Sequence, residues 1–337
     1  MSTTQTMTRL LDSLQSHARL LIEAELAPVM GDRFQPTGFA DLGAAQYETP
    51  DGRQMLLVES AQSMANRLEH ACLDGDGPRI APELQGLPYV VARLSGESDA
   101  ETSSLVEAHR LNSPFIISDE GFQKRFVDLS GYTKGKVIDW KKVARAMFHY
   151  DPSSLIHGVF MANLGDGRVR VPRALTGFIE ASNVREAVSG GVKNNPLDPT
   201  GTIRAKGYDK DVYGNVPYHR TEYTAQSIQA MFNLDLALVR GFRLPEAAQE
   251  LLVALALYKV RSFLEGGLRL RTACDLCLKG DVRVRPESFR LPDRGDLLSH
   301  VQELIRECAR EALFADPAVT EIQTVTVKKT SKDAEEE

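Results

Sequence analysis

The sequence predicts an α+β domain, and three observations lead to this prediction. Short apolar runs typical of strands alternate along the chain with segments whose apolar residues recur at helical spacing. Long polar insertions separate several of these elements. The chain has 337 residues and is 42% hydrophobic, which is ordinary for a protein that buries a sizeable core. We expect one domain over residues 1–327 and a disordered, charged tail over residues 328–337.

In the first third of the chain, apolar residues recur at helical spacing in some segments and at the spacing of strands in others. Residues 8–26 carry apolar side chains at helical spacing and predict an amphipathic helix, whereas glycines and prolines over residues 28–52 predict a loop. Residues 55–58 predict a strand that turns at Glu59 and Ser60 into a helix. Further on we expect a strand at 87–94, an exposed polar segment at 96–104 and a short apolar run at 114–118.

The spacing of apolar residues also predicts the remaining helices and strands. Residues 139–149 predict a helix, and its Trp140 is interpreted as a core or interface anchor rather than a base-stacking platform. Residues 245–264 begin with a proline and predict a buried helix, because apolar residues nearly encircle it; Gly266 and Gly267 end this helix. The other expected elements are strands at 157–163, 168–171, 175–181, 221–238, 268–271 and 282–285, and a helix at 296–314.

A polar row at the start of the helix after residue 60 is the first candidate site. Ser60, Ser63 and Arg67 share one face of this helix, while the apolar residues occupy another. The first turn of a helix has unpaired N–H groups and the positive end of the dipole, so hydroxyls and an arginine there favour a phosphate. The alternative is that Ser60 only caps the helix and Arg67 is only a solvated charge.

Two pairs of arginines alternate with apolar residues in predicted strands. Arg168 and Arg170 share one strand face, and Arg269 and Arg271 share another, close to glycines that permit a near approach of backbone. These pairs are candidates for contacts with a nucleic-acid backbone. For Arg168 and Arg170 the alternative is a solvated strand edge.

Residues 189–220 form the most distinctive insertion. They hold five glycines, three prolines and few aliphatic residues, and such a long segment inside a domain is usually functional. Cations neutralise phosphates and aromatic rings stack on bases, so the mixture suits a surface that follows a strand. The alternative is a subunit contact loop without an RNA role. The candidate residues are Lys193, Arg204, Lys206, Tyr208, Lys210, Tyr213 and Arg220.

Charge and cysteine content limit other functions. The net charge is −6, but residues 168–220 hold nine Lys or Arg against five Asp or Glu, so a local basic groove is compatible with an acidic chain. The amino end lacks an apolar core typical of signal peptides, and no run approaches a membrane span, so we expect a cytoplasmic protein. The lone Cys274-x-x-Cys277 lacks a matching ligand pair, and we expect no metal and no cofactor.

Three strings in the sequence resemble one family. The strings are LLVESAQSMANRLE (from Leu56), RVRVPRALTGFIEASNVREAV (from Arg168) and NLDLALVRGFRLPEAAQELLVALALYKVRSFLEGGLRLRTACDL (from Asn233). They resemble the RAMP-superfamily backbone subunit of the type I-G (formerly I-U) CRISPR Cascade effector. The resemblance extends over most of residues 50–315. A lysine that some members carry in the first motif is absent here.

The resemblance implies an RRM-like (ferredoxin-like) palm with inserted helices and a thumb hairpin, for which residues 189–220 are the candidate. It also implies a non-catalytic subunit that polymerises along CRISPR guide RNA and presents it for pairing with target DNA. Implied partners are other copies of the chain, the large subunit, the handle-capping subunit and a helicase-nuclease. At the helix start, the implied guide contacts are Ser60, Gln62, Ser63, Asn66 and Arg67.

Two other classes of function receive less support from the sequence. A RAMP endoribonuclease that cleaves guide precursor or target RNA would need a general base, and the available residues have no spacing that defines a site. These residues are His157, His219, Asp198 and Asp209. A small-molecule enzyme has no support, because the chain lacks a Walker loop, a Rossmann glycine set and a nucleophile elbow.

Overall fold

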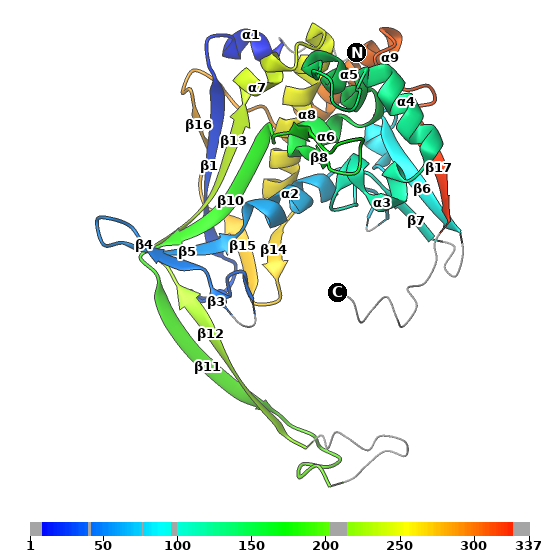
Figure 1. The fold of residues 1–337 in the computed structure, drawn as a ribbon. Helices are drawn as coiled ribbons and strands as arrows, with labels where there is room; N and C mark the ends of the chain where they lie inside the picture. The colour runs from blue at the N-terminus through cyan, green and yellow to red at the C-terminus, as the bar shows by residue number, and fades with distance from the viewer. Residues whose placement is uncertain (1–8, 40–41, 76, 96–99, 203–213, 326–337) are drawn as a thin grey trace, which may run out of the picture.

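A computed structural model describes residues 9–39, 42–75, 77–95, 100–202 and 214–325. Its centre is an eight-stranded antiparallel sheet (Figure 1). One strand, β16 (Arg283–Arg285), pairs with β1 beside the main path. The order along that path is β14 (Leu268–Arg271), β15 (Cys274–Leu278), β1 (Arg19–Pro28), β13 (Ser227–Asp235), β10 (Leu175–Ser182), β5 (Gln54–Glu59) and β4 (Gln46–Glu48).

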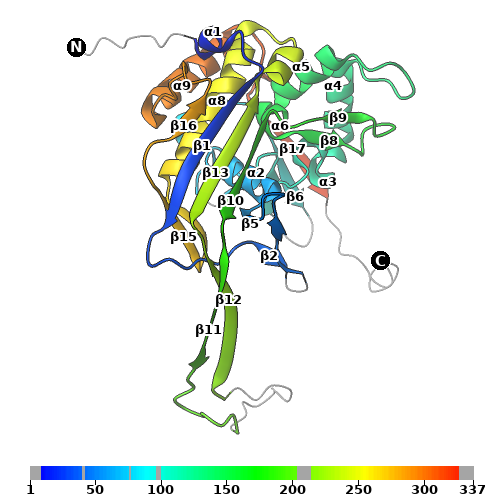
Figure 2. The ribbon, with the colours of Figure 1, turned by 90° about the vertical axis from the view of Figure 1, so that its left-hand side faces the viewer.

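Helices cover one face of this sheet. Burial alternates strictly along β1, β10 and β13, so that Leu20, Ile22, Ala24 and Leu26 of β1 enter the core. Helices α2 (Ala61–His70) and α8 (Glu246–Glu265) pack behind them, and Figure 2 shows the opposite face of β1, β13 and β10 without a helix in front of it. One face of the sheet is therefore buried under helices, and the other face is more accessible to solvent.

Helix α8 is the centre of the helical layer. Sixteen of its twenty residues are buried, as its encircling apolar pattern predicts. It contacts α9 (Arg294–Arg310), α1 (Leu10–Leu14), α7 (Leu236–Gly241), α6 (Pro152–His157) and α2. No helix among the described residues is long and apolar enough to cross a membrane.

A second region lies beside this layer. It contains a three-stranded sheet in which β6 (Tyr89–Ser95) pairs in parallel with β17 (Val319–Val325) and antiparallel with β7 (Ala100–Ser103). The remaining elements here are η1 (Pro82–Leu84), η2 (Arg110–Asn112), α3 (Pro114–Ile117), α4 (Glu120–Ser130), α5 (Trp140–Tyr150), β8 (Val159–Met161) and β9 (Val169–Val171).

A long hairpin projects from the body (Figures 1 and 2). It consists of β11 (Arg185–Lys193) and β12 (Val216–Thr224). Its pairing, from Arg185 with Thr224 to Lys193 with Val216, continues the register of β10 with β13, in which Ser182 faces Ser227. The hairpin is thus the outward end of the two strands at the sheet centre.

Several expectations about individual elements were wrong. Residues 8–26 are not one helix, because α1 ends at Leu14 and β1 begins at Arg19, where alternate residues face the core between two neighbouring strands. Residues 221–238 are not one strand, because they contain the end of β12, the strand β13 and the start of α7.

Two smaller expectations also fail. Of the segment expected to be exposed at 96–104, residues 96–99 lie outside the described residues, and residues 100–103 form β7; Thr102 and Ser103 of this strand and Ser104 after it are buried against β6. Trp140 is 49% exposed and lies at the start of α5, so it is not a core residue. Its role as an interface anchor stays a prediction. The predicted tail at 328–337 lies outside the described residues.

Candidate nucleic-acid interface

The end of β5 carries a buried carboxylate that binds two of the candidate arginines. Glu59 is fully buried, and its side chain accepts hydrogen bonds from Ser63 Oγ, Arg67 Nε and an Arg271 guanidinium nitrogen. The Arg67 Nε to Glu59 Oε1 distance is 2.8 Å. We call these four residues the Glu59 cluster. Its charges, one negative and two positive, leave a net charge of +1.

Backbone carbonyls hold both arginines of the Glu59 cluster in place. Arg67 donates to Leu270 O at 2.7 Å, and Arg271 donates to Gln35 O at 3.0 Å and to Val58 O at 3.2 Å. Arg67, which the sequence predicts to bind a phosphate, thus already has a carboxylate partner. Both side chains remain about a quarter exposed, at 28% and 25%, so their charge still reaches solvent.

Ser60 acts as the N-cap of α2. Its Oγ accepts from Ser63 N at 3.2 Å, and this arrangement satisfies one of the free N–H groups of the first turn. Gln62 and Asn66 are exposed on the same helix. The structure therefore brings the five helix-start residues together as expected, and it gives Ser60 and Ser63 structural partners. Their contact with RNA stays a prediction.

A groove of about 520 Å³ runs between α2 and the turn that leads from α8 into β14. Ser63, Asn66 and Arg67 line one side, and Gly266, Gly267 and Arg269 line the other. Arg269 is exposed, and its side chain forms no ion pair or hydrogen bond with any residue that the structure describes, while the exposed Asp275 faces it across the β14–β15 pair. It is consequently the cation of this groove that is most available to an anion.

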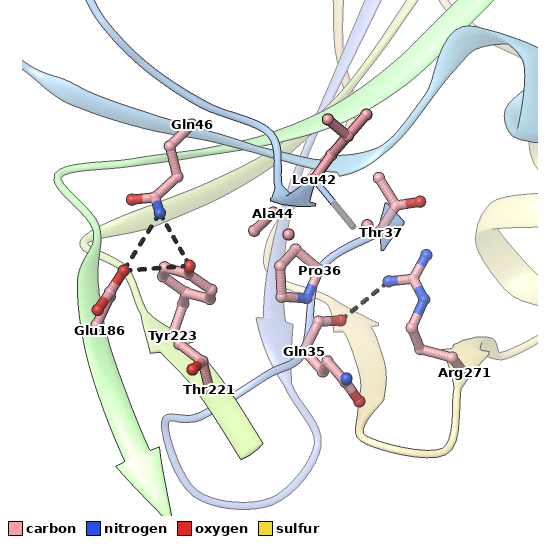
Figure 3. Close-up of a pocket in the computed structure, with 12 residues that line it drawn as sticks. Gln35, Pro36, Thr37, Leu42, Ala44, Gln46, Glu186, Thr221, Tyr223 and Arg271 are labelled. Carbon is pink, nitrogen blue, oxygen red and sulfur yellow. Dashed lines mark hydrogen bonds between the residues drawn. The ribbon is translucent and has the colours of Figure 1, made fainter. Parts of the chain in front are cut away.

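A second hollow, of about 600 Å³, lies at the root of the hairpin (Figure 3). Arg271 reaches it from β14, while Tyr223 of β12 and Glu186 of β11 close its other side. Gln46 donates to Tyr223 Oη at 2.9 Å and so ties β4 to the hairpin. The two hollows lie on either side of Glu59, because Arg67 borders one and Arg271 borders the other.

The described part of the hairpin is less basic than its sequence suggests. Arg220 lies 3.7 Å from Glu222, and its guanidinium carbon is 5.5 Å from the centre of the Tyr218 ring. Lys193 is exposed at the end of β11. The candidates Arg204, Lys206, Tyr208, Lys210 and Tyr213 lie outside the described residues, as does Asp209.

The hairpin also exposes apolar side chains. Their exposed fractions reach 73% for Val188 and 81% for Leu197, and Val192, Val216 and Tyr218 are each about half exposed. Exposed apolar groups gathered on one projecting element indicate a surface that another molecule covers.

The other arginine pair lies at the small β8–β9 ribbon, with Arg170 in β9 and Arg168 directly before it. Arg170 and the valines on either side alternate between exposed and buried, as predicted. Arg168 donates to Asp166 at 2.7 Å and to Lys136 O at 2.8 Å, whereas Arg170 stacks 4.2 Å above the Phe160 ring. Nearby Arg173, which no sequence pattern singles out, donates to Ala61 O at 3.0 Å at the start of α2.

Of the residues considered for ribonuclease chemistry, the structure describes His157, Asp198 and His219, which lie on different elements. His157 is fully buried, and burial together with the charge of Lys259 holds its pKa well below the ordinary value. Asp198 is buried and accepts hydrogen bonds from Thr200 and Thr202, and His219 is exposed on the hairpin.

The two cysteines of the C-x-x-C pair lie on opposite faces of β15, since Cys274 is buried and Cys277 is exposed. A single metal ion between these two side chains would require both to turn to one face. Burial raises the pKa of Cys274 to about 11, which disfavours its thiolate.

Comparison with known proteins gives one family match. Residues 20–186 match the family model described as CRISPR-associated protein GSU0053. Over that stretch, just under half of the chain, the protein is similar to CRISPR-associated proteins. No curated protein matches the sequence.

Three solved structures are also similar, at low sequence identity. A chain of a "CRISPR RNA-guided surveillance complex, pre-nicking" is 15% identical with a TM-score of 0.41, over 87% of this chain and 89% of that one. Csc2 from Thermofilum pendens is 10% identical with a TM-score of 0.30, over 91% and 80%. A chain of a "CRISPR RNA-guided surveillance complex" is 13% identical with a TM-score of 0.25, over 73% and 71%. At these TM-scores the likeness is too slight to assign a function.

Proposed function

We propose that this chain is a non-catalytic backbone subunit of a CRISPR effector, of the type I-G class, that binds guide RNA. Copies of the chain polymerise along the guide and present it for pairing with target DNA. Sequence recognition is then left to base pairing, and the protein supplies backbone contacts and spacing. The large subunit, the handle-capping subunit and a helicase-nuclease are the other proposed partners, in the cytoplasm.

The observation that carries this proposal is the hairpin that continues the two central strands beside an arginine-lined groove. Because β11 and β12 keep the register of β10 and β13, the hairpin has a fixed root in the sheet. One such projection from each copy provides a regular spacer along a strand. Its exposed Val188 and Leu197 provide apolar surface for a neighbouring copy or for unstacked bases.

The sheet topology supports the palm expected from the resemblance. The strands β15, β1, β13 and β10 lie side by side in this order. Helix α2 occurs between β1 and β10 in sequence, and α8 between β13 and β15. This is the βαββαβ arrangement of ferredoxin-like domains, with β5, β4 and the α3–α6 region as insertions. We therefore assign these four strands and two helices to an RRM-like palm.

The proposal is tested by purification and by titration. Protein expressed with a CRISPR array should copurify with RNA of defined length, whereas protein expressed alone should bind unrelated single-stranded RNA with an affinity that falls steeply with salt. Absence of salt-dependent RNA binding would reject the RNA-binding role.

A cleavage assay separates this proposal from a ribonuclease. Labelled guide and target RNA should remain intact with the protein, with and without divalent metal. Cleavage that disappears in His219→Ala, the exposed histidine of the hairpin, would favour the endoribonuclease instead. Cleavage that persists in that variant would point to a contaminant or to another site.

A further inference from the structure

A pocket of about 640 Å³ lies between η2, the end of α6 and the β8–β9 ribbon, apart from the Glu59 cluster. We call it the β8–β9 pocket. Arg110, Arg170 and Arg173 line it, together with His109 and His157. Among the described residues that line it, none carries a carboxylate. The pocket is therefore built for a negatively charged or electron-rich ligand.

Two of its three arginines form no ion pair with a carboxylate of the described residues. Arg110 is neutralised, because it donates to both carboxylate oxygens of Glu69 at 2.7 and 2.8 Å. Arg173 has only the carbonyl of Ala61 as a hydrogen-bond partner among the described residues; burial and the nearby charge of Arg110 lower its pKa, and the charge of Glu69 opposes this shift. Arg170 has only the Phe160 ring as a partner among the described residues. An anion between Arg170 and Arg173 would relieve this unbalanced charge.

His157 adds a buried donor without a partner. Its Nε2 lies 2.9 Å from Lys259 Nζ, and an ammonium can only donate, so the imidazole proton is on Nδ1. Nδ1 finds no hydrogen-bond partner among the residues that the structure describes. A buried donor left unpaired costs about 1–3 kcal/mol. His157 borders the pocket, but its side chain is fully buried, so an acceptor oxygen of a ligand reaches this proton only if the pocket lining shifts.

Phe160 supplies an aromatic platform at the mouth of the pocket. It is 43% exposed, and the Arg170 guanidinium already lies over its ring. Aromatic rings and arginine planes are the surfaces on which proteins stack unpaired bases.

We propose that the β8–β9 pocket binds one nucleotide of a single-stranded RNA, with the phosphate at Arg173 and the base against Phe160 and Arg170. This inference rests on the proposed function and adds a contact site for the same strand. The pocket adjoins the first turn of α2 through Ala61, on whose helix the groove residues Ser63, Asn66 and Arg67 lie. A strand held in the groove can thus place a neighbouring nucleotide in the pocket.

The test is photo-crosslinking of the full chain to a short RNA that carries 4-thiouridine, followed by peptide mass spectrometry. We expect a crosslink on a peptide that contains Phe160. Arg173→Gln and Phe160→Leu should each abolish it and weaken RNA binding by about tenfold, the effect of losing one stacked base or one phosphate contact. Arg145→Gln, an exposed arginine on α5, is the matched control and should leave both unchanged.

The outcomes separate the two proposals. If RNA binds normally but no crosslink forms at Phe160, and Arg170→Gln leaves the affinity unchanged, the pocket is not a nucleotide site while the proposed function stands. If RNA does not bind at all, both fail. Since Arg173 is partly buried, thermal melts accompany each variant, and the exposed Phe160 and Arg170 keep the test decisive if Arg173→Gln unfolds.

Discussion

Replacing Glu59 with glutamine separates the structural role of the Glu59 cluster from its role in RNA binding. Glutamine keeps the shape of the side chain but removes the negative charge that Arg67 and Arg271 share. Loss of one partner of a buried ion pair costs about 3–5 kcal/mol. Here both arginines are about a quarter exposed and keep their carbonyl partners, so we expect a loss of about 2–3 kcal/mol in the free energy of unfolding.

The same substitution should strengthen RNA binding. Without the carboxylate, the net charge of the Glu59 cluster rises from +1 to +2, and both guanidinium groups become available to phosphate. For single-stranded nucleic acid, each additional neutralised phosphate steepens the dependence of log affinity on log salt by about 0.7. Glu59→Gln should therefore melt about 5 °C lower than the parent and bind RNA more tightly at low salt, with a steeper salt slope.

The measurements are a thermal melt and RNA titrations at several salt concentrations below the melting temperature. Glu250→Gln is the matched control, because Glu250 is equally buried and accepts from Leu10 N, Leu11 N and His300. It lies at the opposite end of the helical layer, beside α1, and should lower the melting temperature without changing RNA binding. An unchanged salt slope in Glu59→Gln, or weaker binding, would show that the carboxylate does not compete with RNA for the arginines.

Three further predictions concern other parts of the molecule. Arg269→Ala should leave the melting temperature unchanged and lower the salt slope of RNA binding by about 0.7, since this arginine lacks a partner among the described residues; an unchanged slope would remove the groove from the interface. Replacing residues 189–220 with an Asn-Gly turn, which joins the paired Val188 and Thr221, should preserve the melting temperature but remove regular nuclease protection of assembled RNA; retained periodicity would show that the hairpin is not a thumb. His157 has a pKa below its unfolded value, so its stabilising contribution is present above about pH 6.5 and falls by up to about 1.4 kcal/mol per pH unit below it. The difference in melting temperature between the parent and His157→Gln should therefore shrink from about pH 7 to about pH 5.5, and a constant difference would contradict the neutral buried imidazole.

The local sequence predicted the strand and helix around Ser60 because both signals are local. The apolar run of β5, the capping serine and the helical period of α2 lie next to one another in the chain, and each holds independently of tertiary contacts. The prediction of a helix for residues 19–26 was wrong because their leucines fit both a helical and an alternating period. Pairing with β13 and β15 makes this segment a strand, and both partner strands lie more than 190 residues further along the chain, where a local pattern cannot detect them.

The partners of the candidate arginines could not be predicted from local patterns. Glu59 stands in the turn before a helix and reads as a surface residue, yet one of its arginines is 212 residues further along the chain. Arg173 follows Pro172 in an irregular segment and carries no periodic signal. The buried contact between His157 and Lys259 spans 102 residues. Burial of a charged group depends on which distant segments meet there, and one-dimensional spacing does not contain this information.

The arrangement of charges at the candidate interface suggests that RNA binding depends on several copies of the chain bound to one strand. The carboxylates of Glu59 and Glu69 are buried and pair with Arg67, Arg271 and Arg110, so much of the charge of these arginines is compensated within the protein. In the groove and the β8–β9 pocket, each copy then offers few cations without a carboxylate partner among the described residues, such as Arg170 and Arg269. A single copy should bind RNA weakly. When several copies lie on one strand, contacts between neighbours raise the effective concentration of each copy near the RNA, and the overall affinity increases. Affinity should consequently rise steeply with RNA length once two copies fit on one strand, and equal affinity for one-copy and several-copy RNAs would contradict this view.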